Sequence, residues 1–233
     1  MNGCNLKYIA MITMFIDHLA AILLPSETPV YLVFRIIGRL AFPIFCFLLI
    51  EGFRHTHSVK NYLTRLGIFA FISEIPFDLA FTAKYYGDYW QDQNVFFTLF
   101  IGLAVIWGMS IVDKKFYKDT FQSKFLNRLL QGIVVMTGCF AAFFLKTDYS
   151  YMGIFLIVVF YLFREKKALM TFFVLLVNLF LGGIIQAFAT LALVFTFRYN
   201  GERGPQANKY LFYIFYPAHI LFLYLISLLP IFT

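Results

Sequence analysis

The chain has 233 residues, of which 61% are hydrophobic and 13% are charged, and it carries 32 Phe and 15 Tyr. Soluble domains contain about 25% charged residues, so this composition excludes a water-soluble globular fold. The sequence predicts an all-α fold, a polytopic transmembrane helical bundle in which residues 1–233 form a single domain. A net charge of +7 would also suit a nucleic-acid-binding protein, but the placement of the charges argues against it.

Nine apolar segments follow one another along the chain. They cover residues 6–24, 30–53, 61–83, 94–112, 126–145, 150–163, 168–181, 184–198 and 210–230. We divide the stretch 168–198 because Gly182-Gly183 in its middle predicts a turn or break. Unbroken, it would reach roughly 46 Å, which is too long for one untilted crossing. The first segment lacks a clear small-residue cleavage site after it, so we expect it to remain as a span.

The basic residues favour one orientation, with the N-terminus in the cytoplasm and the C-terminus outside. Cytoplasmic loops carry an excess of Lys and Arg, and nine spans place fifteen of the nineteen basic residues there. These fifteen are Lys7, Arg54, Lys60, Arg65, Lys114, Lys115, Lys118, Lys124, Arg128, Arg164, Lys166, Lys167, Arg198, Arg203 and Lys209. The outer loops hold only Lys84 and Lys146, and the short aromatic loop 84–93 is expected at the outer interface. The positive charge is thus explained without nucleic acid.

Ionisable residues inside the apolar segments are the first candidates for function. Asp17 and His18 stand near the middle of the first segment, where a charged carboxylate costs about 2.5–3.5 kcal/mol on insertion scales. Arg35 and Arg39 lie one helical turn apart, so they share a face of the second segment. Such residues usually face a bundle interior and pair with one another. We expect a polar cavity between the middle and the outer half of the membrane.

Further polar residues lie at matching depth. They are Glu74 in the third segment, Asn94 and Thr98 at the start of the fourth, Asp148 in an outer loop and His219 in the last segment. Two interpretations stay open for them. An Arg–carboxylate pair can serve only to hold the bundle together, and a single His in a span often hydrogen-bonds between helices. A neutral imidazole at this depth can also accept a proton from a nucleophile.

Two cytoplasmic stretches complete the candidates. EGFRHTHS, residues 51–58, contains Arg54, and YNGERGP, residues 199–205, contains Gly201, Arg203 and Gly204. A tight glycine turn beside a cation can hold phosphate, although a solvated loop is the plainer interpretation of either stretch. The three cysteines are scattered, so we expect neither a disulfide framework nor a metal site. No Walker motif, zinc spacing or nucleophile elbow is present in the sequence.

Six stretches in order resemble the TraX family of membrane proteins, over nearly the whole chain. They are LKYIAMITMFIDHLAAILLP, FRIIGRLAFPIFCFLLIEGFRHTHSVKNYLTRL, ISEIPFDL, NVFFTLFIGL, TDYSYMGI and YNGERGPQANKYLFYIFYPAHILFLYL. That family is associated with N-terminal acetylation of the conjugative pilin, and is distantly similar to integral-membrane acyltransferases. The resemblance implies a multi-pass protein of the bacterial cytoplasmic membrane. Its implied activity is transfer of an acetyl group from cytosolic acetyl-CoA to an extracytoplasmic pilin, peptide or glycan.

For such an activity, the residues themselves suggest roles for the candidates. His18 or His219 would be the general base, Asp17 or Glu74 would orient the histidine, and Arg39 would stabilise the oxyanion. The CoA phosphates would be bound on the cytoplasmic side by Arg203, Lys209, Arg54 and the turn at Gly201. The acceptor would enter from outside past Arg35, Asn94, Thr98 and Asp148. The only partners expected besides this acceptor are membrane lipids.

Two other functions remain open. A small proton-coupled secondary transporter would also use intramembrane charges and a glycine-broken helix, although nine spans are awkward for paired repeats and no internal symmetry is found. A scaffold protein would have little need for two histidines in mid-membrane. No strong GxxxG face occurs in the segments, so the sequence makes no prediction of oligomeric state.

Overall fold

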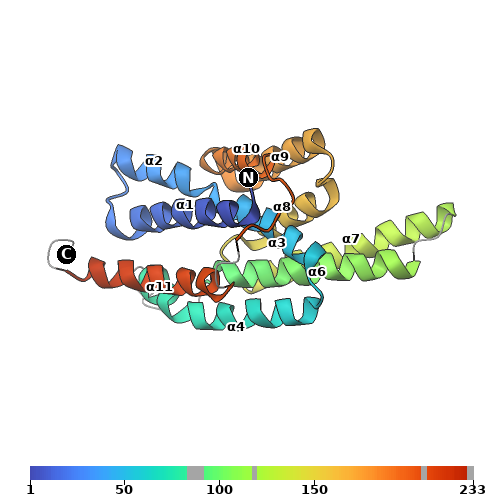
Figure 1. Cartoon of the computed structure of the whole chain (residues 1–233), viewed down its shortest axis with the longest axis horizontal. Helices are drawn as coiled ribbons and strands as arrows, with labels where there is room; N and C mark the ends of the chain where they lie inside the picture. Colours follow the sequence, from blue (N-terminus) through green and yellow to red (C-terminus); the bar gives the residue numbers. More distant parts are fainter. Residues whose placement is uncertain (83–91, 117–119, 206–208, 230–233) are drawn as a thin grey trace.

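The computed structural model describes residues 1–82, 92–116, 120–205 and 209–229 (Figure 1). These residues are helical almost throughout, as the composition predicts. The elements in chain order are α1 (Gly3–Leu23), α2 (Pro29–Gly38), α3 (Ala41–His55), α4 (Val59–Phe77), the π-helical turn η1 (Asp78–Thr82), α6 (Val95–Phe116), α7 (Phe121–Phe144), α8 (Ser150–Phe163), α9 (Lys167–Ala187), the 3-10 turn η2 (Phe188–Ala192), α10 (Leu193–Thr196) and α11 (Lys209–Ser227). A single bridge pairs Gln93 with Thr147.

Local sequence signals set several helix starts. A side-chain oxygen accepts a hydrogen bond from the backbone N–H three residues later at Asn2, Thr28, Ser58 and Thr120. Such caps satisfy one of the four backbone donors that a helix N-terminus leaves without a partner. Pro43 explains the kink between α2 and α3, since it has no N–H and its ring clashes with the carbonyl of Arg39. The predicted second segment is therefore two helices.

The expectation of nine spans is wrong. Within the described residues, six stretches are long and apolar enough to cross a membrane, namely Gly3–Leu23, Pro29–His55, Val95–Phe116, Phe121–Phe144, Lys167–Thr196 and Tyr210–Ser227. Helix α8 is apolar but has only 14 residues, and α4 carries Lys60, Arg65 and Glu74 along its length. The predicted segments 168–181 and 184–198 belong to one stretch of 30 residues. The sidedness that we derived from nine spans stays a prediction.

The break expected at Gly182-Gly183 is confirmed. Gly183 has φ 82° and ψ −176°, so the chain leaves helical geometry inside α9. Residues with a Cβ rarely adopt this backbone conformation, which explains why a glycine stands there. The sequence located the break correctly, but the pieces on its two sides belong to one candidate span of 30 residues and not to two.

The two ends of the chain pack together, and this packing builds the site. Helix α1 lies against α2, α3 and α11, and α6 lies against α4, α7 and α8. In Figure 1 the blue α1 and the red α11 run side by side, while α6 and α7 form a long hairpin at the right. Gly38 permits the closest approach of α1 and α2, because a Cβ there would stand 2.2 Å from the Cβ of Asp17.

Several of the stretches predicted to be cytoplasmic meet in space. The amino group of Met1 donates to the carbonyl of Arg198 at 2.9 Å, and Arg54 pairs with Glu165 at 3.3 Å. Arg164 pairs with the buried Glu51, which ties the C-terminal end of α3 to that of α8. We call the region formed by these residues, Met1, Glu51, Arg54, Arg164, Glu165 and Arg198, the basic end of the molecule.

Candidate functional site

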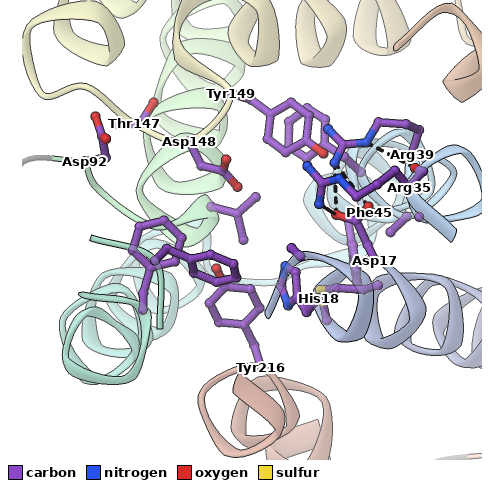
Figure 2. Close-up of a pocket in the computed structure, with 18 of the residues that line it drawn as sticks. Asp17, His18, Arg35, Arg39, Phe45, Asp92, Thr147, Asp148, Tyr149 and Tyr216 are labelled. Carbon is purple, nitrogen blue, oxygen red and sulfur yellow. Dashed lines mark hydrogen bonds and ion pairs between the residues drawn. The ribbon is translucent and has the colours of Figure 1, made fainter. Parts of the chain in front are cut away.

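A cavity of about 420 Å³ lies among the helices (Figure 2). Its wall comes from α1, α2 and the start of α3, from the end of α4 with η1, from Asp92 and the start of α6, from residues 146–149 between α7 and α8, and from α11. Five of the predicted site residues line it, and they are Asp17, His18, Arg35, Arg39 and Asp148. The polar cavity that the sequence predicts is therefore present, with part of the expected residues.

Asp17 holds two guanidinium groups. Arg35 Nη1 donates to Asp17 Oδ2 at 2.9 Å, and Arg39 Nη2 donates to both carboxylate oxygens, at 3.1 and 3.0 Å. Arg39 is held further by the carbonyl of Arg35 and by Gln186 Oε1, both at 3.4 Å. One carboxylate between two guanidinium groups leaves a net positive charge at this wall of the cavity.

His18 and His219 form a hydrogen-bonded pair. His18 Nδ1 lies 2.7 Å from His219 Nε2, and His219 Nδ1 lies 2.6 Å from the carbonyl oxygen of Phe215. A carbonyl can only accept, so His219 carries its proton on Nδ1 and its Nε2 accepts the proton of His18 Nδ1. Of the two rings, His18 is consequently the one that keeps a free lone pair, on its Nε2.

The two histidines differ in access to the cavity. His18 is part of the cavity wall, whereas His219 is not, and the residue His219 is only 5% exposed. The sequence left open which of the two is the reactive base, and this geometry favours His18. Asp17 does not orient either ring, because both of its oxygens are engaged by the arginines.

Glu74, Asn94 and Thr98 lie outside the cavity wall. Glu74 Oε2 accepts hydrogen bonds from the backbone N–H of Asn94, at 3.3 Å, and from its side-chain amide. Asn94 also donates to the carbonyl of Ala70 at 2.8 Å and caps α6 at Phe96. Thr98 packs against Gly153, where a Cβ would stand 2.5 Å from its methyl group. These three buried side chains therefore join α6 to α4 and α8.

The connection between α7 and α8 is held in an unusual backbone conformation. Lys146 and Ser150 have φ of 49° and 44°, and left-handed geometry is uncommon for residues other than glycine. The segment is fixed to the start of α6, since Gln93 N–H donates to the carbonyl of Lys146 at 3.0 Å and Asp148 N–H donates to that of Gln93 at 2.7 Å. This places the Asp148 carboxyl on the cavity (Figure 2). Desolvation by the surrounding protein raises its pKa to about 6, although the arginines opposite act to lower it and the residue stays exposed on the cavity surface.

The residues predicted to bind a cofactor lie away from this cavity. Arg54 and Arg203 are exposed at the basic end, and neither lines the cavity. Gly201 has φ 83° in the predicted turn, but the carbonyls of Glu202 and Arg203 accept the first N–H groups of α1, from Gly3 and Cys4. The side chain of Lys209 lies outside the described residues, as do Lys84 and most of the loop 84–93.

Several cavity residues were missed at the sequence level, among them three with a hydroxyl group. Thr147 and Tyr149 flank Asp148, and Tyr216 comes from α11. The spacing of Tyr216 and His219 is a signal that could have found Tyr216, since residues three apart lie on one helix face. Thr147 and Tyr149 carry no comparable signal, because they stand in a turn.

A bundle of apolar helices around a buried Asp–Arg–Arg cluster and a histidine pair defines a multi-pass membrane protein with a polar site inside the bundle. The chain belongs to the TraX protein family, whose family profile matches residues 2–227. It is also similar to the probable fimbrial assembly protein FimC, serogroup H1, of Dichelobacter nodosus, with 30% identity over 242 aligned positions that cover 94% of this chain and 93% of that protein. No solved structure matches the chain. The family resemblance of the sequence is thereby confirmed.

Proposed function

We propose that this protein is an integral-membrane acetyltransferase, which moves an acetyl group from cytosolic acetyl-CoA to an extracytoplasmic acceptor. The observation that carries the proposal is the histidine pair, in which the hydrogen-bond chain from Phe215 leaves a basic nitrogen on His18 at the cavity. The TraX family is associated with pilin acetylation, which supports this activity. The name of the fimbrial relative supports a pilin-like acceptor.

The residues of the cavity suffice for the proton transfers of the reaction. An amine or hydroxyl of the acceptor attacks the thioester carbonyl, while His18 Nε2 takes the proton that the nucleophile loses. The new N–C or O–C bond forms, the C–S bond breaks, and the thiolate of CoA takes the proton back from His18. His219 stabilises the charged intermediate imidazole, because its Nε2 accepts from His18 Nδ1.

Binding of the two substrates would use opposite sides of the site. The acceptor contacts Asp148 and the Arg35 side of the cavity, where the connection 146–150 is hydrogen-bonded to Gln93. The CoA phosphates bind cations at the basic end, with Arg203, Arg54 and Lys209 as candidates. No residue set for a metal ion is found among the described residues, and the proposed chemistry uses none.

One observation favours a second function, a small proton-coupled transporter. The break in α9 at Gly183 lies near Gln186, which contacts Arg39 at the cavity. Transporters build their sites from such interrupted helices. In that case the cavity would bind a ligand without consuming acetyl-CoA.

The test uses the purified protein in nanodiscs with radiolabelled acetyl-CoA and a pilin N-terminal peptide. Wild type and His57→Ala, which changes an exposed histidine, are expected to transfer the label to the peptide. The transfer rate of His18→Ala is expected to be about 10²–10⁴-fold lower than that of wild type. Full activity of His18→Ala would show that His18 is not the general base. If wild type neither transfers the acetyl group nor deacetylates acetyl-CoA, the transporter is favoured.

A further inference from the structure

Tyr216 places a hydroxyl group in the cavity beside the base. The residue is 2% exposed, and its ring stands edge-on to His18 with the ring centroids 5.9 Å apart. Figure 2 shows it reaching from α11 into the cavity, on the side where His18 lies. The hydroxyl proton has no acceptor among the described residues.

Packing alone does not require a hydroxyl at this position. Phe42, Phe45, Phe77 and Phe81 serve as the aromatic wall of the same cavity, and a Phe would fill the space of Tyr216 equally well. A buried hydroxyl that loses water and gains no acceptor lowers stability. Groups of this kind in native proteins point to a ligand that supplies the missing partner.

The guanidinium group that the sequence suggested for the oxyanion is already engaged. Arg39 bonds through Nε to the carbonyl of Arg35, through Nη1 to Gln186 and through Nη2 to Asp17. Arg35 bonds to Asp17 through Nη1. Arg39 could therefore donate to the substrate only by giving up one of these bonds, whereas Tyr216 can donate without any rearrangement.

We propose that Tyr216 is a catalytic residue, whose hydroxyl donates a hydrogen bond to the acyl carbonyl oxygen as negative charge develops on it. This inference rests on the proposed acetyl transfer. The proposed role also gives a reason for the spacing of Tyr216 and His219, which lie one turn apart on α11. A single helix therefore sets both the donor and the residue that orients the base.

The surroundings favour negative charge at this point. Val95, in the first turn of α6, lies next to the Tyr216 hydroxyl and also lines the cavity. The first N–H groups of a helix carry partial positive charge. An oxyanion held by Tyr216 would therefore stand close to the positive end of α6.

The step balances without further reactants. The acceptor nitrogen or oxygen bonds to the carbonyl carbon, the carbonyl π pair moves to oxygen, and His18 takes the proton from the nucleophile. Tyr216 keeps its own proton and stabilises the oxyanion. Collapse of the tetrahedral intermediate breaks the C–S bond, and the thiolate receives the proton from His18.

The test compares Tyr216→Phe with wild type and with Tyr213→Phe in nanodiscs. Tyr213 lies on the same helix and stacks on Phe69 at 4.9 Å, but it does not line the cavity. Tyr216→Phe is expected to lower kcat by about 10²-fold or more, as loss of one oxyanion donor does. KM for acetyl-CoA and the pH at which His18 titrates in the rate profile should be unchanged, and Tyr213→Phe should retain kcat.

Each outcome bears on a different statement. An active wild type with an equally active Tyr216→Phe variant overturns the role of Tyr216 and leaves the acetyltransferase standing, whereas an inactive wild type overturns both. If Tyr216→Phe does not fold, 3-fluorotyrosine at position 216 replaces it, since that residue keeps the ring and strengthens the donor. An altered kcat at constant KM then supports the role, and an unaltered kcat overturns it.

Discussion

His18 and His219 are 201 residues apart in the chain, yet their Nδ1 and Nε2 atoms lie 2.7 Å apart. The carbonyl oxygen of Phe215, 2.6 Å from His219 Nδ1, decides which of the two keeps a free lone pair. In the proposed reaction this relationship separates the basic ring from the positioning ring, although both are histidines inside the helical bundle.

The first prediction concerns His219 as a positioning residue. His219→Gln retains an oxygen that can accept from His18 Nδ1, so it should keep more activity than His219→Leu, which offers no acceptor. We expect His219→Leu to shift the acidic limb of the pH–rate profile of acetyl transfer, where the base becomes protonated, because the tautomer of His18 is no longer fixed. Equal activity in the two variants would show that the hydrogen bond has no role in the reaction.

The second prediction concerns the close approach of α1 and α2. Gly38→Ala places a Cβ 2.2 Å from Asp17, and overpacking of this kind costs about 1–3 kcal/mol. Gly132→Ala is the control, because nothing lies within 4 Å of the added Cβ on α7. The melting temperature in detergent should fall clearly for Gly38→Ala and should stay the same or rise for Gly132→Ala. A similar melting temperature for both would contradict the packing described here.

The third prediction concerns the partly buried ion pairs of Asp17. Asp17→Asn leaves Arg35 and Arg39 without a counter-ion, and breaking a fully buried pair in this way costs about 3–5 kcal/mol. Because the two arginine side chains are 26% and 17% exposed, we expect a loss of stability below that range but above that of an exposed pair. Glu165→Gln is the matched control, since Glu165 pairs with Arg54 and Arg164 while 71% of its side chain is exposed. Exposed pairs contribute about 0–1 kcal/mol. Unfolding measurements that rank the two variants alike would refute the structural role of Asp17.

The fourth prediction concerns pH and Asp148. Partial desolvation raises the pKa of Asp148 to about 6 in the folded protein, against about 3.9 in an unfolded chain. The protonated form therefore stabilises the fold fully below about pH 4, and this contribution is lost as the pH rises through about 6. Asp148→Asn does not titrate, so its melting temperature relative to wild type should rise between pH 4 and pH 6 and then level off. A constant difference over this range would show that Asp148 has an ordinary pKa.

Much of the fold was predictable from local sequence. Composition alone indicates a helical membrane protein, and Gly182-Gly183 marks the break that the structure has at Gly183. The count of spans was not predictable in the same way. It depends on where the helices begin and end, since the stretch on both sides of Gly183 is continuous enough to be one candidate span and α8 has only 14 residues.

The sequence by itself determined the class of protein, the family and the set of ionisable residues that needed partners, because burying such groups is costly wherever they stand. Only the tertiary structure decided the partners. Asp17 meets two arginines, Glu74 meets Asn94, and His18 meets His219. The physical reason is that helix periodicity reports which face of one helix is polar. Which faces meet depends on packing, through close contacts such as that of Gly38 with Asp17 and of α11 with α1.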